Sequence, residues 1–199
     1  MLRIDHPLIL PLVPQSVRGP ILLLWRLDAR LAELAHAGRE PALRLIRLRW
    51  WADRLGALAD GPPAEPLLQE AHEQLLDRMT PADLAGLAEA WFDYAESEGS
   101  NDAPGKSLFS LTSRLLLPTA PTGSPDAAAL WFHVSGLLGQ PDGADWAGAA
   151  RRALPVNIAG WPRPLAALAG LSRAIALRHG VRSPGREQLL LLRIGLIGR

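Results

Sequence analysis

Apolar residues recur at helical spacing along nearly the whole chain, and proline or glycine separates one such stretch from the next. Because Leu and Ala dominate and Val is rare, the pattern predicts helices and no strand. The expected helices follow a proline-rich extended arm over 1–19 and cover 20–37, 41–60, 65–78, 81–97, 107–116, 125–139, 143–153, 164–178 and 184–197. The predicted fold class is therefore all-α, in a single domain over 1–199 with short connections between antiparallel neighbours.

The second expected helix has an unusual distribution of charge. At about 100° per residue, the arc predicted to face water carries Arg49 and Asp53. The opposite arc, predicted to face the interior, carries three arginines among large apolar residues: Arg44, Arg47 and Arg54 with Trp51, Leu55 and Leu58. A buried charge is costly unless it is paired or binds something, so these guanidinium groups are expected to have a partner.

One candidate partner lies in the preceding helix. Asp28 is a lone carboxylate on an otherwise apolar face. An ion pair between Asp28 and one of the three inward arginines is the simplest structural account. The functional alternative is a cationic pocket for a phosphate or diphosphate, since three arginines exceed one carboxylate. The sequence leaves both interpretations open.

Composition narrows the possible function classes. The chain has no cysteine, which excludes disulfides, thiolate catalysis and zinc–thiolate sites. A net charge of +1 gives no reason to expect a nucleic-acid partner. The first residues lack a signal-peptide pattern, and no apolar run approaches the length of a membrane span. The expected location is the cytoplasm, with the periphery of the inner membrane as the alternative.

Two later helices carry acidic stripes, one with Glu70, Glu73 and Asp77, the other with Glu89, Asp93 and Glu96. Facing helices of this kind can hold magnesium through carboxylate oxygens. The alternative is that both stripes are solvated faces of amphipathic helices. The sequence contains no helical histidine pair, nucleophile elbow, phosphate loop or dinucleotide fingerprint.

From the second expected helix onward, the chain resembles the squalene/phytoene synthase-like family. LRLIRLRWWADRLGAL followed by GPPAEPLLQEA is similar to the family's Arg-Leu-x-Trp-Trp helix, its Gly-x-Pro loop and the proline that opens the next helix. The matching residues are Arg47, Leu48, Trp50, Trp51, Gly61, Pro63 and Pro66. LLLWRLDARLAEL upstream and two C-terminal stretches, 161–180 and 186–199, also resemble family helices. The resemblance implies a shortened isoprenoid-synthase-like helical bundle around a central cavity.

The resemblance also implies what is missing. Active members of the family bind magnesium through two aspartate-rich motifs, and the metal holds a prenyl diphosphate and assists its ionisation. Here Arg30 and Leu34 stand where the first aspartates would align, and AALWFHVSGLLG contains no carboxylate where the second motif would lie. Without two carboxylate clusters, the chain has no ligands to hold the magnesium ions that metal-assisted ionisation requires. The chain looks closest to the family's non-enzymatic, complex I assembly factor-like branch.

These observations lead to one main hypothesis: a catalytically silent pseudoenzyme of the family, acting in binding or assembly, without catalytic residues, cofactor or metal. Its expected cavity is lined by Asp28, Arg44, Arg47, Trp51 and Arg54. The expected ligand or partner is a prenyl diphosphate, an anionic lipid, a protein or a membrane surface.

Two alternatives remain. The first is a divergent prenyl-diphosphate transferase of isoprenoid biosynthesis. It would use magnesium, and it predicts that the acidic residues of the two stripes face one shared cavity: Glu70, Glu73, Glu89 and Asp93. The second is a purely structural helical protein, in which Asp28 and the arginines form satisfied internal ion pairs.

Overall fold

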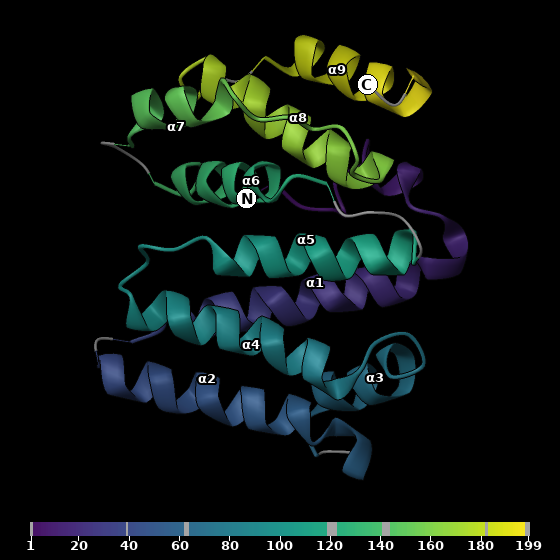
Figure 1. Cartoon of the computed structure of the whole chain (residues 1–199), viewed down its shortest axis with the longest axis vertical. Coiled ribbons are helices and arrows are strands. Elements are labelled where there is room, and N and C mark those ends of the chain that lie inside the picture. The colour runs from purple at the N-terminus through teal and green to yellow at the C-terminus, as the bar shows by residue number, and fades with distance from the viewer. Residues whose placement is uncertain are drawn as a thin grey trace. The chain divides into compact units, whose positions relative to one another are not determined.

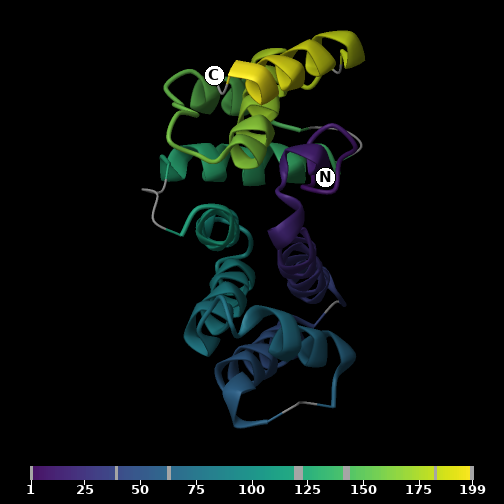
Figure 2. The same ribbon diagram turned by 90° about the vertical axis from the view of Figure 1, so that its right-hand side faces the viewer.

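The computed structural model describes residues 2–38, 40–61, 64–118, 123–140, 144–181 and 183–197. Within these ranges the chain forms α-helices and two short 3-10 helices and no strand, as the all-α prediction requires. The α-helices are α1 (Gln15–His36), α2 (Pro41–Gly56), α3 (Pro66–Leu75), α4 (Pro81–Glu96), α5 (Ala103–Leu116), α6 (Pro125–Leu137), α7 (Trp146–Ala153), α8 (Arg163–Leu177) and α9 (Pro184–Ile197), and the 3-10 helices are η1 (Leu10–Leu12) and η2 (Leu58–Asp60). Figures 1 and 2 show these elements from two directions.

Capping residues explain several of the boundaries. Thr80 and Asp83 form a reciprocal capping box at the start of α4, and Glu65, Ser124 and Asp145 each accept a backbone N–H at the starts of α3, α6 and α7. Gly180, at φ +81°, follows the last turn of α8. Proline and glycine were therefore sound guides to where most of the helices begin and end.

The N-terminal segment differs from the expected extended arm. α1 begins at Gln15, so Pro20 lies inside the helix and does not open it. Residues 2–14 form turns and the 3-10 helix η1, and Ile4 and Ile9 are fully buried. Pro20 has no N–H to donate to the carbonyl of Ser16, so α1 continues through it without that backbone hydrogen bond.

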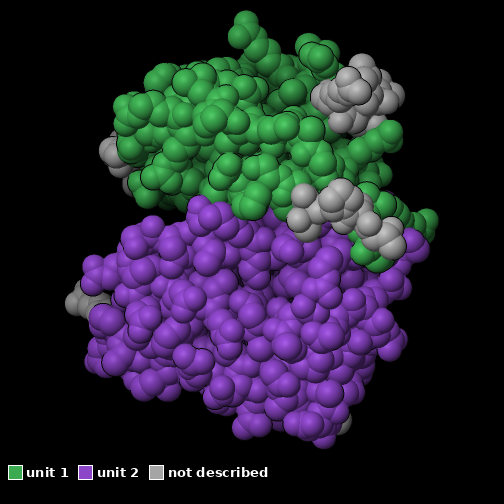
Figure 3. Space-filling view, in the orientation of Figure 1, with its two compact units in different colours: residues 1–15, 116–199 green, residues 16–115 purple. Residues whose placement is uncertain are grey.

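The chain divides into two compact units, coloured separately in Figure 3: unit 2 covers 16–115, and unit 1 covers 1–15 with 116–199. The single domain expected over 1–199 stays a prediction. No helix in the described ranges is long and apolar enough to cross a membrane.

Unit 1 is built around α8, which packs against α6, α7 and α9. α8 is buried on nearly all sides, because its sequence is apolar all round and rich in alanine. The N-terminal segment belongs to the same unit: the indole Nε1 of Trp131 donates a hydrogen bond of 3.0 Å to the carbonyl of Leu2. The first and last parts of the chain therefore share one core.

Unit 2 contains α1 to α5, and α4 is its central element. α2 packs along one side of α4, at the edge of the unit (Figures 1 and 2). Buried hydrogen bonds join α1 to its neighbours: Trp91 of α4 donates to Asp28, and Trp25 donates to Thr112 of α5 at 3.0 Å. Among the described residues, no other α-helix packs along α2 as α4 does.

Candidate functional site

The inner face of α2 is an apolar packing surface. Proline at the first helical position, Pro41, starts the helix. Leu48, Trp51, Ala52 and Leu55 are buried on the side that packs against α4. Trp51 is only 4% exposed. Its predicted inward position is therefore correct.

The arginines of α2 do not follow the prediction. Arg47 and Arg54 are exposed, and Arg44 is half-buried, its Nε having no hydrogen-bond partner among the described residues. The prediction that all three guanidinium groups point inward is wrong for Arg47 and Arg54. The physical reason is that α2 has two apolar arcs and not one, and these two arginines lie between them.

The second apolar arc faces outward. Leu43, Ile46 and Trp50 are 45%, 63% and 42% exposed and recur at i, i+3 and i+7, so they form one stripe, which we call the outer stripe. The guanidinium carbon of Arg54 lies 5.7 Å from the centroid of the Trp50 ring, within cation–π range. The prediction from the sequence considered one apolar arc only, so it did not include the exposure of these three residues.

Trp50 belongs to the outer stripe and Trp51 to the buried inner face. Their rings meet edge to face, with centroids 5.8 Å apart and an interplanar angle of 80°. Arg49 is held on the α4 side, its guanidinium carbon 4.5 Å from the ring centroid of Phe92. Arg49 was expected to be simply solvated, and the contact with Phe92 adds packing to that position.

Asp28 is buried as expected, at 3% exposed, but in a different setting from the predicted one. Its carboxylate accepts a hydrogen bond of 2.8 Å from the indole Nε1 of Trp91. None of the ion pairs formed among the described residues joins Asp28 to an arginine of α2. The sequence could not show this hydrogen bond, because its donor lies on α4, 63 residues further along the chain.

A ring cluster continues from Trp91. Tyr94 and His36 both pack against it, with ring centroids 5.3 Å and 6.1 Å from that of Trp91. Burial raises the pKa of Tyr94, so its hydroxyl stays protonated. The Nδ1 atom of His36 lies 2.7 Å from the carbonyl oxygen of Ala32 in its own helix. The cluster is a packing feature that joins α1 to α4.

The acidic stripes do not converge on a cavity. Glu70 accepts a hydrogen bond of 2.7 Å from Arg26, while Glu73, Glu89 and Asp93 are exposed. The prediction of one shared cavity for these four carboxylates is wrong, because α3 and α4 direct them to solvent or to an arginine. Among the described residues, no group of three or more His, Asp or Glu side chains is placed to hold a metal ion.

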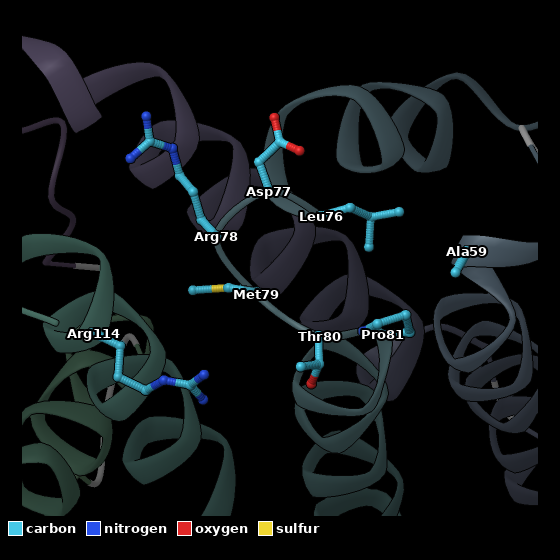
Figure 4. A pocket seen from close by; sticks show the side chains of 8 residues that line it. All are labelled: Ala59, Leu76, Asp77, Arg78, Met79, Thr80, Pro81 and Arg114. Carbon is cyan, nitrogen blue, oxygen red and sulfur yellow. The ribbon is translucent and has the colours of Figure 1, made fainter.

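A shallow cavity of about 380 Å³ lies elsewhere in unit 2, at the turn between α3 and α4 (Figure 4). Its lining is Ala59, Leu76, Asp77, Arg78, Met79, Thr80, Pro81 and Arg114. Arg114 is not free for a ligand, because its two terminal nitrogens bond both carboxylate oxygens of Asp83, at 2.6 Å and 2.9 Å. That hydrogen bonding, more than the contact with Thr80, lowers the pKa of Asp83 to about 2.

This cavity was not predicted from the sequence. The sequence identified Thr80 and Pro81 as a helix start, but nothing linked Asp83 to an arginine 31 residues later. With Arg114 neutralised, the lining offers one exposed cation, Arg78, and no concentrated charge. The outer side of α2 is the stronger candidate site, since it combines exposed apolar side chains with Arg47 and Arg54, which form no ion pair among the described residues.

Comparison with known proteins adds no assignment. No family model, no curated protein and no solved structure matches the chain.

Proposed function

We propose that this chain is a catalytically silent protein of the squalene/phytoene synthase-like kind, and that it acts by binding. Its binding site is the outer side of α2, and its ligand combines a phosphate group with an apolar chain. Relative to the expectation from sequence, the proposal keeps the ligand class and moves the site from an interior cavity to an exposed helix face.

One observation carries the proposal: Arg47 and Arg54 are exposed on α2 directly beside the outer stripe of Leu43, Ile46 and Trp50. Guanidinium groups match phosphate oxygens in geometry and charge. Covering exposed leucine, isoleucine and tryptophan side chains with an apolar chain removes them from water and is favourable. A ligand with both parts, such as a prenyl or lipid phosphate, would satisfy both halves of this surface.

The alternatives receive less support. A prenyl-diphosphate transferase would need carboxylates gathered around one cavity, whereas Glu73 on α3 and Glu89 and Asp93 on α4 are exposed. A purely structural role was predicted to rest on internal ion pairs between Asp28 and the α2 arginines. The exposure of Arg47 and Arg54 argues against such internal pairs for these two arginines.

The binding experiment uses geranyl diphosphate, a soluble ligand of the required class, in isothermal titration calorimetry with the whole protein. Wild type is expected to bind, and the double variant R47Q/R54Q is expected to bind about tenfold more weakly, because two charge-assisted contacts are lost at an exposed site. The matched control is R151Q, an exposed arginine of α7. Binding that is absent in wild type, or unchanged in R47Q/R54Q, would refute the proposed site.

Catalytic silence is tested separately. The protein is incubated with farnesyl diphosphate and magnesium, and released diphosphate is measured against a heat-inactivated sample. We expect no difference between the two. Turnover above the inactivated control would overturn the silent assignment and revive the transferase alternative.

A further inference from the structure

The outer stripe is apolar, continuous and narrow. Leu43, Ile46 and Trp50 are 45%, 63% and 42% exposed along successive turns of α2. The opposite side of the same helix is fixed against α4, so the stripe is presented on a helix that is already folded. Because only one of its two apolar arcs packs within unit 2, α2 has apolar surface that remains exposed.

Positive charge is concentrated on the same helix. α2 contains four arginines and one aspartate, a charge of +3, whereas the whole chain has a net charge of only +1. Arg47 and Arg54 are exposed next to the stripe, and Arg54 lies against the Trp50 ring. The apolar surface is therefore flanked by cations that no recorded ion pair among the described residues neutralises.

We propose that the outer side of α2 docks onto an anionic lipid bilayer, with Leu43, Ile46 and Trp50 inserted at the boundary between headgroups and acyl chains. Arg47 and Arg54 then contact lipid phosphates, their aliphatic stems lying along the apolar boundary. This inference rests on the proposed function, since it names lipid headgroups as the source of the phosphate. The helix lies in the plane of the interface and does not cross the bilayer.

Charge and area favour a bilayer over a protein partner. A stable protein interface buries about 800 Å² on each partner, which three partly exposed apolar side chains do not approach. An interfacial helix needs only a short row of apolar residues with basic residues beside it, because the membrane supplies the remaining area and the opposite charge. Tryptophan is also a preferred residue at the membrane–water boundary.

The test is vesicle flotation with the full chain. One set of vesicles contains phosphatidylcholine alone, and the other also contains phosphatidylglycerol. We expect the protein to float with the anionic vesicles, to remain unbound with the neutral ones, and to bind less as salt concentration rises. In vesicles with brominated acyl chains, quenching of tryptophan fluorescence should be smaller in W50F than in wild type.

Variants on both surfaces make the test specific. R47Q and R54Q are each expected to weaken partitioning about fivefold, and I46S about tenfold. The matched controls are R151Q on α7 and L189S on α9, where Leu189 is 69% exposed. The controls should partition like wild type. Because all these positions are exposed, unchanged thermal unfolding verifies that each variant is folded.

Several outcomes would overturn the inference: no flotation with anionic vesicles, equal binding to neutral vesicles, or losses in the control variants as large as those in the α2 variants. A second copy of the chain is the competing occupant. If wild type sediments as a dimer and I46S as a monomer, the stripe is an interface between copies, and the bilayer assignment is wrong. Loss of vesicle binding with retained geranyl diphosphate binding would refute the bilayer alone and leave the proposed function standing.

Discussion

The indole Nε1 of Trp91 donates a hydrogen bond of 2.8 Å to the buried carboxylate of Asp28, and this contact links α1 to α4 in the interior of unit 2. An aspartate in an apolar environment is stable only if hydrogen bonds replace its lost hydration. The link therefore belongs to the stability of unit 2, and α2 has no part in it.

Replacing Asp28 tests this relationship. D28L leaves the Trp91 N–H without its acceptor, and we expect a loss of about 1–3 kcal/mol in the free energy of unfolding. D28N retains an acceptor oxygen and should lose less than D28L. Urea denaturation of both variants, followed by fluorescence, gives the comparison. Equal losses would show that the hydrogen bond contributes little.

The two neighbouring tryptophans of α2 should differ sharply. W51A removes a buried ring from the contact with α4 and is expected to cost about 3–5 kcal/mol. W50A removes a ring that is 42% exposed and should cost less than about 1 kcal/mol. Thermal or urea unfolding of the pair measures the difference, and similar losses would contradict the placement of the two faces.

Asp83 should make unit 2 sensitive to acid. Its pKa is lowered from 3.8 to about 2, mainly by the hydrogen bonds from Arg114. Because the folded state favours the ionised carboxylate, Asp83 stabilises the fold at pH values above its ordinary pKa of 3.8. That stabilisation is lost as the pH falls from 3.8 towards 2. Solvent screening of the partly exposed pair limits the effect to about 1 kcal/mol.

The variant D83N tests this origin. D83N lacks the titrating carboxyl. The difference in unfolding free energy between wild type and D83N should therefore become smaller as the pH is lowered through the interval in which Asp83 is protonated. Denaturation in urea at a series of acidic pH values measures it. A difference that stays constant with pH would show that Asp83 acts through helix capping alone.

His133 should make the stability of unit 1 depend on pH in a weakly acidic range, well above the range in which Asp83 acts. Burial lowers its pKa from 6.5; the nearby charge of Arg152 lowers it further, and Asp145 opposes both. Because the folded state disfavours the protonated ring, stability should fall as the pH drops below 6.5. The substitution R152Q should raise the pKa of His133, which NMR titration of the imidazole would detect. An unchanged or lower pKa in R152Q would exclude this charge effect.

The sequence predicted the helices well and the environment of α2 poorly, and the reason is physical. Proline, glycine and capping residues act locally, so Pro41, Thr80 and Gly180 mark boundaries without knowledge of the fold. Burial depends on which neighbour covers a face. Trp51 and Trp50 are adjacent and chemically identical, and only the position of α4 decides which of them is buried.

The same limitation applies to the candidate site. The helical projection was interpreted with one apolar face, and α2 has two. Arg47 was therefore predicted to face the interior, whereas it lies between the two apolar arcs. The Asp28–Trp91 and Asp83–Arg114 contacts join residues 63 and 31 positions apart, and neither has a local signature. Both need the tertiary arrangement before they can be recognised.

The edge position of α2 has a consequence for how this protein can diverge. Its inner residues are constrained by α4, whereas the residues of the outer stripe are largely exposed, and Trp50 contacts the core through the edge of the Trp51 ring. Substitutions on the outer arc can accumulate nearly independently of folding, because exposed helix positions tolerate change at little cost in stability. The helix can thus acquire a new binding preference by surface substitution alone, and a designer could exchange its outer arc while retaining the inner one as a fixed anchor.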